Sequence, residues 1–229
     1  MTEERTVIVN GKQYGIVLSD ERETLLAARA AGRVPVGLWK EQTDFSMVRY
    51  LVETPDCADE RFLERVVRRE LHLPWEIAES DRLRLREFTA EDCNEILSEP
   101  QDTDQDRIFC EGDTLEAYIR NQYGFYEYGV WAVVRKSDGV ILGTAGVVGA
   151  EETEDAGLRL ELGYHIFEPY RRCGYAMETC RLILDYVHEE YEAQMYARTA
   201  KENQASRMLL EKMGFVLDRE EDELVRYCE

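Results

Sequence analysis

The chain has 229 residues, of which 44% are hydrophobic, and its net charge is −20. This hydrophobic content supports a buried core and excludes a chain that is disordered throughout. Because so negative a surface repels phosphate backbones, no nucleic acid is expected as a partner. Residues 81–229 hold 33 acidic and 17 basic side chains, so most of the excess negative charge lies in the C-terminal two-thirds of the chain. It serves either solubility or the attraction of a cationic partner.

A cytoplasmic protein is expected, with neither a membrane segment nor a metal site. No apolar run reaches the roughly 18 residues of a membrane span, and the polar residues 1–5 do not begin a secretory signal. The six cysteines show no CxxC or CxH spacing, which indicates free thiols in a reducing compartment.

Residues 1–78 predict a small, three-stranded, Rossmann-like α/β domain. Its expected strands cover 14–18, 34–39 and 49–53, and its expected helices cover 21–31 and 59–71. Strand–helix–strand order favours parallel pairing. Pro74 ends the second helix, because the residue before proline avoids the helical region. We place the boundary between residues 78 and 79.

Part of this domain resembles the C-terminal portion of haloacid-dehalogenase-like hydrolases, through residues 17–20, 25–33 and 36–38. That family carries a nucleophilic aspartate on an earlier strand. Residues 1–19 contain no aspartate, so phosphatase chemistry lacks its nucleophile. Asp20 then serves as a helix cap, and the domain as a docking or structural appendage.

Residues 79–229 predict a domain of the α/β (α+β) class, with a mixed central sheet flanked by helices. Thr89 and Asp92 form a capping-box signature after the first strand. The expected strands are 82–88, 130–135, 140–148, 158–167, 194–199, 215–217 and 224–227. The expected helices start at Thr89 and cover 114–126, 175–190 and 204–213.

One loop carries the clearest binding signature. The strand at 158–167 alternates apolar and polar residues, and the next helix opens on the loop Arg171-Arg172-Cys173-Gly174-Tyr175-Ala176. A loop whose amides converge at a helix N-terminus binds anions, and glycine lets the backbone approach a phosphate closely. Two arginines in a strongly acidic segment point to a polyanionic ligand.

A second signature follows about 28 residues later: Asn203-Gln204-Ala205-Ser206, and then Glu211-Lys212-Met213-Gly214-Phe215. Together with the loop it resembles the GNAT acetyltransferase superfamily over about residues 82–228. The run ELGYHI at 161–166 is similar to the same strand in the ribosomal-protein N-terminal-alanine acetyltransferase-like branch.

The resemblance implies a GNAT fold and acetyl-CoA as co-substrate. It assigns the pyrophosphate of the co-substrate to Arg171, Arg172, Cys173, Gly174, Tyr175 and Ala176. The pantetheine arm is assigned to backbone groups of Tyr164, Ile166 and Phe167. Asn203 would hydrogen-bond the pantetheine, and Ser206 would lie near the sulfur.

The implied reaction is direct attack of a primary amine on the acetyl thioester. Glu161 is the candidate base, and an ordinary surface glutamate is the alternative. Ser206 is the candidate donor to the leaving thiolate. Many GNAT enzymes place a tyrosine acid where this chain has Leu210, so Tyr164 and Tyr196 are considered as substitutes. The missing tyrosine also leaves open a non-catalytic acyl-CoA sensor or interaction module.

The acceptor is expected to be cationic, either a protein N-terminus or a small amine. Residues 99–116 contain seven acidic side chains and one arginine. In the resembled fold this link borders the entrance to the acceptor site, where acidic side chains would raise the local concentration of cationic amines. A solvated loop is the alternative reading. A homodimer is compatible with the sequence.

Overall fold

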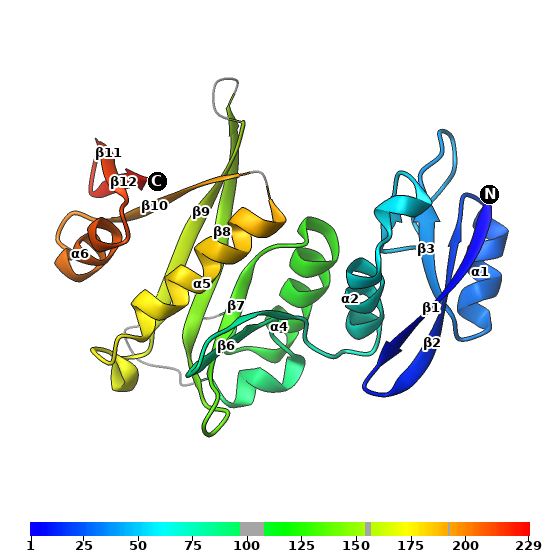
Figure 1. The fold of residues 1–229 in the computed structure, drawn as a ribbon, viewed down its shortest axis with the longest axis horizontal. Helices are drawn as coiled ribbons and strands as arrows, with labels where there is room; N and C mark the ends of the chain where they lie inside the picture. The colour runs from blue at the N-terminus through cyan, green and yellow to red at the C-terminus, as the bar shows by residue number, and fades with distance from the viewer. Residues whose placement is uncertain (97–107, 154–156, 192) are drawn as a thin grey trace. The chain divides into compact units, whose positions relative to one another are not determined.

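The computed structural model describes residues 1–96, 108–153, 157–191 and 193–229. The chain divides into two compact units. The smaller comprises Met1–Trp75 with Gly124–Tyr126, and the larger comprises Glu76–Tyr123 with Glu127–Glu229. Each unit has its own sheet (Figure 1).

The smaller unit contains a four-stranded sheet with the order β1-β2-β3-β4. Its strands are β1 (Thr2–Val9), β2 (Lys12–Ser19), β3 (Val34–Leu38) and β4 (Leu51–Val52). Its helices are α1 (Arg22–Ala30), the 3-10 turn η1 (Pro55–Cys57) and α2 (Glu60–Glu70). Strands β2, β3 and β4 pair in parallel, as predicted from the strand–helix–strand order.

The sheet has a fourth strand, β1, which was not predicted from the sequence. It pairs antiparallel with β2 through a turn at Asn10 and Gly11, whose φ angles are 50° and 76°. Asn-Gly between two strands favours this turn, because both central residues need positive φ. The Asn-Gly turn signal was present in the sequence, but the charged residues at the start of β1 obscured the strand that precedes it.

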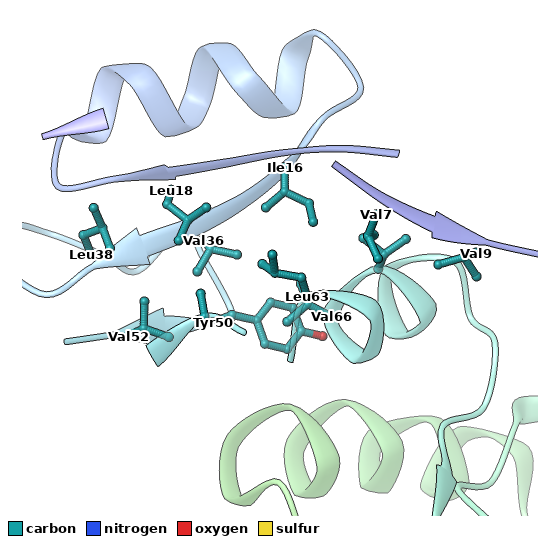
Figure 2. Close-up of a cluster of buried hydrophobic side chains, with 12 residues drawn as sticks. Val7, Val9, Ile16, Leu18, Val36, Leu38, Tyr50, Val52, Leu63 and Val66 are labelled. Atoms are coloured by element: carbon teal, nitrogen blue, oxygen red, sulfur yellow. The ribbon is translucent and has the colours of Figure 1, made fainter. Parts of the chain in front are cut away.

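The core of the smaller unit lies between its sheet and α2. Figure 2 shows side chains from the four strands directed toward Leu63 and Val66 of α2. Ile16 and Leu18 belong to this layer and are fully buried. Val17 points to the opposite face because side chains alternate along a strand, and it is buried there as well.

The larger unit is built on an eight-stranded sheet with the order β11-β12-β10-β9-β8-β7-β6-β5. Only β9 and β10 are parallel neighbours in it. Its strands are β5 (Glu76–Glu79), β6 (Leu83–Arg86), β7 (Val130–Arg135), β8 (Ile141–Thr153), β9 (Gly157–Ile166), β10 (Gln194–Ala200), β11 (Val216–Glu221) and β12 (Leu224–Cys228). This mixed sheet with flanking helices confirms the predicted fold class.

The helices of the larger unit connect these strands. They are the 3-10 turns η2 (Ala90–Asn94) and η4 (Glu168–Tyr170), the α-helices α4 (Gly112–Tyr118), α5 (Tyr175–Glu190) and α6 (Gln204–Lys212), and the π-helix η3 (Ile119–Tyr126), of which Gly124–Tyr126 are grouped with the smaller unit. The predicted helix over 114–126 is thus an α-helix that continues as a π-helix. Helix α5 packs across β5, β6, β8 and β9, as Figure 1 shows in yellow, and α6 packs on β10.

Strand β5 was also missed, because its four residues begin and end with glutamate. It pairs with β6 at the edge of the large sheet. The boundary predicted between residues 78 and 79 therefore falls inside a strand of the larger unit. That each unit is an independent domain stays a prediction. In the described parts of the chain, no helix has both the length and the apolar character that a membrane span requires.

Replacing Leu18 by alanine should destabilise the smaller unit by about 2–5 kcal/mol, because it leaves a cavity in a closely packed core. Ile8→Ala is the control: Ile8 is 68% exposed, and its truncation should change stability by less than about 0.5 kcal/mol. Amide hydrogen exchange in β2 and β3 measures the effect within this unit. Equal protection in both variants would contradict the proposed core.

Candidate functional site

The site begins where β9 and β10 separate. Their parallel pairing covers residues 159–161 of β9 and 194–196 of β10. Beyond it β9 runs on to Ile166, while β10 runs on to Ala200 paired with β12. The C-terminal half of β9 thus has β8 on one side and an opening on the other.

Two residues of β9 turn their backbone groups toward this open edge. The N–H of Phe167, just after β9, donates to the carbonyl of Leu142 at 2.9 Å, toward β8. Because successive residues of a strand present their backbone groups to opposite edges, those of Tyr164 and Ile166 face the opening. The backbone of Phe167 is engaged, because its N–H donates to Leu142 and its carbonyl accepts from the N–H of Tyr170, and its side chain is fully buried. Its assignment to the pantetheine stays a prediction.

The loop at 171–176 has the geometry of an anion site. Arg172 and Gly174 adopt left-handed conformations with φ of 62° and 84°, and α5 begins at Tyr175. The first amides of a helix have no partner within the helix and carry the positive end of its dipole. Arg171, Arg172, Cys173 and Gly174 are exposed, and Tyr175 and Ala176 are half-buried. The loop can therefore receive a phosphate group from solvent.

Arg82 braces this loop, a role that the sequence analysis did not predict. It donates to the carbonyl of Cys173 at 3.2 Å and to the carboxylate of Glu178 at 2.8 Å, and it lies 4.7 Å from the ring centre of Tyr175. Ser80 also donates to Glu178 at 2.6 Å. Burial raises the pKa of Glu178, but the bonds from Arg82 and Ser80 outweigh this and lower it. The only acid in the first turn of α5 is thereby neutralised by a cation.

Arg171 connects the loop to the end of β9. Its Nε donates to the carbonyl of Ile166 at 2.7 Å, and its Nη2 lies 2.9 Å from Nε2 of His165. The Ile166 carbonyl faces the opening, so this guanidinium stands where the strand edge meets the anion site. Any ligand that follows the edge into the loop passes Arg171.

Two hydroxyls meet where β9 and α6 approach each other. The hydroxyl of Tyr164 on β9 lies 2.7 Å from that of Ser206 on α6. Asn203 caps α6 by accepting from the N–H of Ser206, the third residue of the helix, at 3.1 Å, which fixes the position of Ser206 in the first turn. Burial raises the pKa of Tyr164 to about 12, against the opposing effect of the Ser206 hydrogen bond. Tyr164 thus remains a proton donor at neutral pH.

Glu161 lies at the last paired position, opposite Tyr196. It is 7% exposed, and both its oxygens accept from Arg198, at 2.9 and 2.8 Å. The Tyr196 hydroxyl donates to it at 3.2 Å. Glu161 is therefore a paired, buried carboxylate rather than a surface residue. Acting as a base requires that Arg198 first leave it.

The remaining predicted features lie partly outside the described residues. Of the acidic stretch at 99–116, residues 99–107 are not described, whereas Glu111, Asp113 and Glu116 are exposed at the start of α4. Leu210 is fully buried in α6 and contributes no polar group. Among the described side chains, no group of three or more His, Cys, Asp or Glu residues is arranged to hold a metal ion.

A family model described as an acetyltransferase (GNAT) domain matches residues 82–216. The match spans more than half of the chain, which therefore belongs to the GNAT acetyltransferase family. Members of this family transfer an acetyl group from acetyl-CoA.

Among curated proteins, the chain is 28% identical over 109 residues to the uncharacterized N-acetyltransferase YjdG of Bacillus subtilis. This match covers 47% of the present chain and 62% of the relative, which is less than two-thirds of the relative's length.

Solved structures share the fold of the larger unit. A ribosomal-protein-S5-alanine acetyltransferase from Vibrio fischeri is 14% identical, with a TM-score of 0.55 over 69% of this chain and 96% of that one. An acetyltransferase from Agrobacterium tumefaciens is 20% identical, with a TM-score of 0.51 over 66% and 92% of the two chains. At these identities the likeness concerns the fold alone. The resemblance of the smaller unit to haloacid-dehalogenase-like hydrolases stays a prediction.

Replacing Arg82 by glutamine should weaken acetyl-CoA binding about two- to five-fold, the contribution of one charge near a helix terminus. The variant leaves the carboxylate of Glu178 without its cation beside the anion site. Titration calorimetry with acetyl-CoA measures the affinity. Arg84→Gln removes the same charge two residues further along, on β6, where Arg84 pairs with Glu76, and should bind as the wild type does. Equal affinities of the two variants for acetyl-CoA would contradict the proposed role of Arg82 in supporting the loop.

Proposed function

We propose that the protein is an acetyl-CoA-dependent N-acetyltransferase that acts on a primary amine by direct attack. The observation that carries this proposal is the hydroxyl pair of Tyr164 and Ser206 in the opening between β9 and β10. This opening ends at an anion-binding loop, so one ligand can span both. We assign the pyrophosphate to the amides of residues 172–176 and the pantetheine to the β9 edge.

The chemistry needs one bond made and one broken. The lone pair of the neutral amine attacks the carbonyl carbon of the thioester, and the carbon–sulfur bond then breaks. The thiolate gains a proton, and the amine nitrogen loses one. Tyr164 is the proposed acid, because its hydroxyl stays protonated near neutral pH and shares a hydrogen bond with Ser206.

Glu161 remains the proposed base for the amine. Its place at the end of the paired region, on a strand that lines the opening, supports the assignment. An incoming ammonium group has a pKa of roughly 8 to 10 and must lose a proton before attack. Glu161 becomes available for that proton when Arg198 moves away.

The acceptor is proposed to be cationic, as a protein N-terminus or a small amine. The strong negative charge of residues 81–229 supports this class, as do the exposed acids at the start of α4. A negative field raises the local concentration of cations and speeds their encounter with the site.

A non-catalytic acyl-CoA sensor is the competing proposal. Its support is Leu210, an apolar and fully buried residue at the position where many GNAT enzymes carry the acidic tyrosine. A sensor binds acetyl-CoA without releasing thiol, so one assay separates the two proposals.

Incubation with acetyl-CoA and a panel of amines, including spermidine and an alanine-initiated peptide, should release free CoA thiol. The release is followed with a thiol reagent, and calorimetry measures acetyl-CoA binding in parallel. Binding without release from any amine would favour the sensor. Absence of binding at millimolar acetyl-CoA would refute both proposals.

Gly174→Glu serves as the loss-of-binding variant for this assay. Its side chain must start from a backbone with φ of 84° and brings a negative charge to the anion loop. Gly139→Glu is matched in strain, since Gly139 has φ of 76° and lies in the turn between β7 and β8. Only the Gly174 variant should lose acetyl-CoA binding.

Replacing Tyr164 by phenylalanine should lower kcat about 100-fold, the lower range for a positioned proton donor. Acetyl-CoA binding should persist, because the proposed contacts of residue 164 with the pantetheine are made by the backbone. Tyr227→Phe is the control; it also removes a buried tyrosine hydroxyl, one that contacts Arg207 and Glu211. A Tyr164 variant with wild-type kcat would assign the acid elsewhere.

A further inference from the structure

Arg198 lies on β10 two residues beyond the last residue paired with β9. It shares a face of the sheet with Tyr196, since the two are two residues apart on one strand. Its guanidinium forms two hydrogen bonds with Glu161, although its side chain is 43% exposed. The exposed member of the pair can swing into solvent, whereas Glu161 is held on β9.

A second arginine faces Arg198 across the sheet. Arg226 on β12 stands directly opposite Arg198 in the register. It has its own partners, because it donates to Glu151 at 3.0 Å and lies over the ring of Tyr196 at 4.0 Å. Like charges directly opposite each other in a sheet destabilise the pairing. The Glu151 carboxylate offsets much of this repulsion, and the two hydrogen bonds with Glu161 hold Arg198.

A second carboxylate contributes to the electrostatic surroundings of Arg198. Glu221 on β11 adds to the attraction that, with the Glu161 hydrogen bonds, raises the pKa of Arg198. Departure from Glu161 consequently does not place the guanidinium in a region without anions. By contrast, Glu161 without any cation would be a buried, uncompensated charge, which is costly.

We propose that Arg198 occupies the place of the acceptor's ammonium group on Glu161 and thereby selects for cationic acceptors. An incoming ammonium exchanges with the guanidinium, so Glu161 keeps a cation until it takes the proton of the ammonium and becomes neutral. A neutral or anionic acceptor offers no replacement and leaves Arg198 in place. This inference deepens the proposed function, because it rests on Glu161 facing the acceptor.

The exchange has a direct kinetic consequence. Arg198→Gln removes the competitor and should lower the KM of spermidine, or of the alanine-initiated peptide, about two- to five-fold, the range for a partly exposed ion pair. The KM of acetyl-CoA should not change. Arg198→Lys restores a cation and should return the acceptor KM toward the wild-type value. A purely structural Arg198 would leave the acceptor KM unchanged or raise it, which would overturn the proposal.

Arg181→Gln controls for the more negative net charge. Arg181 is exposed on α5, and its loss changes the charge by the same amount. Its acceptor KM should stay near that of the wild type. An equal fall of KM in both variants would attribute the effect to the overall field and overturn the proposal.

A binding experiment on the wild-type chain tests the exchange without turnover. The Nε–H signal of Arg198 is followed by NMR in protein labelled with ¹⁵N-arginine and is assigned by its loss in Arg198→Lys. Methylammonium chloride should shift or broaden this signal, whereas sodium chloride at equal ionic strength should not. No difference between the two salts would overturn the proposal. A shift without acetyl transfer to any amine would support the exchange while refuting the proposed enzyme.

Discussion

The separation of β10 from β9 is the constraint on which the site depends. After Glu161 and Tyr196, β10 stays with β12, and β9 continues with one edge open. Backbone N–H and C=O groups need partners, so this edge suits a ligand with amide groups of its own. The same separation leaves room for the hydroxyl of Ser206 to reach Tyr164. One break in the ladder thus creates both a binding edge and a place for chemistry.

Local pairing decides where cations stand in a chain with a net charge of −20. At the start of α5, Arg82 neutralises Glu178, and Arg171 and Arg172 lie in the loop. At the end of the β9–β10 pairing, the pattern is reversed: a buried carboxylate, Glu161, is covered by an exposed guanidinium. The anion site and the proposed ammonium site therefore differ in sign within one acidic domain.

Much of the fold could be predicted because its periodic segments are long. Helix α5 begins and ends at the predicted residues, and the hairpin of β7 and β8 follows its turn signal. Strands β1 and β5 were missed because charged residues conceal their short apolar patterns. The bond between Phe167 and Leu142, and the contact of Arg82 with Cys173, join residues far apart in sequence. No local pattern reveals such contacts.

The sequence by itself determined the family, and it proposed the anion loop and the candidate residues, because these depend on glycine, arginine and the spacing of neighbouring residues. Tertiary structure alone decided what each candidate touches. It paired Glu161 with Arg198 across 37 residues and Tyr164 with Ser206 across 42. The chemical state of a carboxylate or a phenol depends on its neighbours in space. Those neighbours are set by strand order and register, which the local pattern of side chains does not encode.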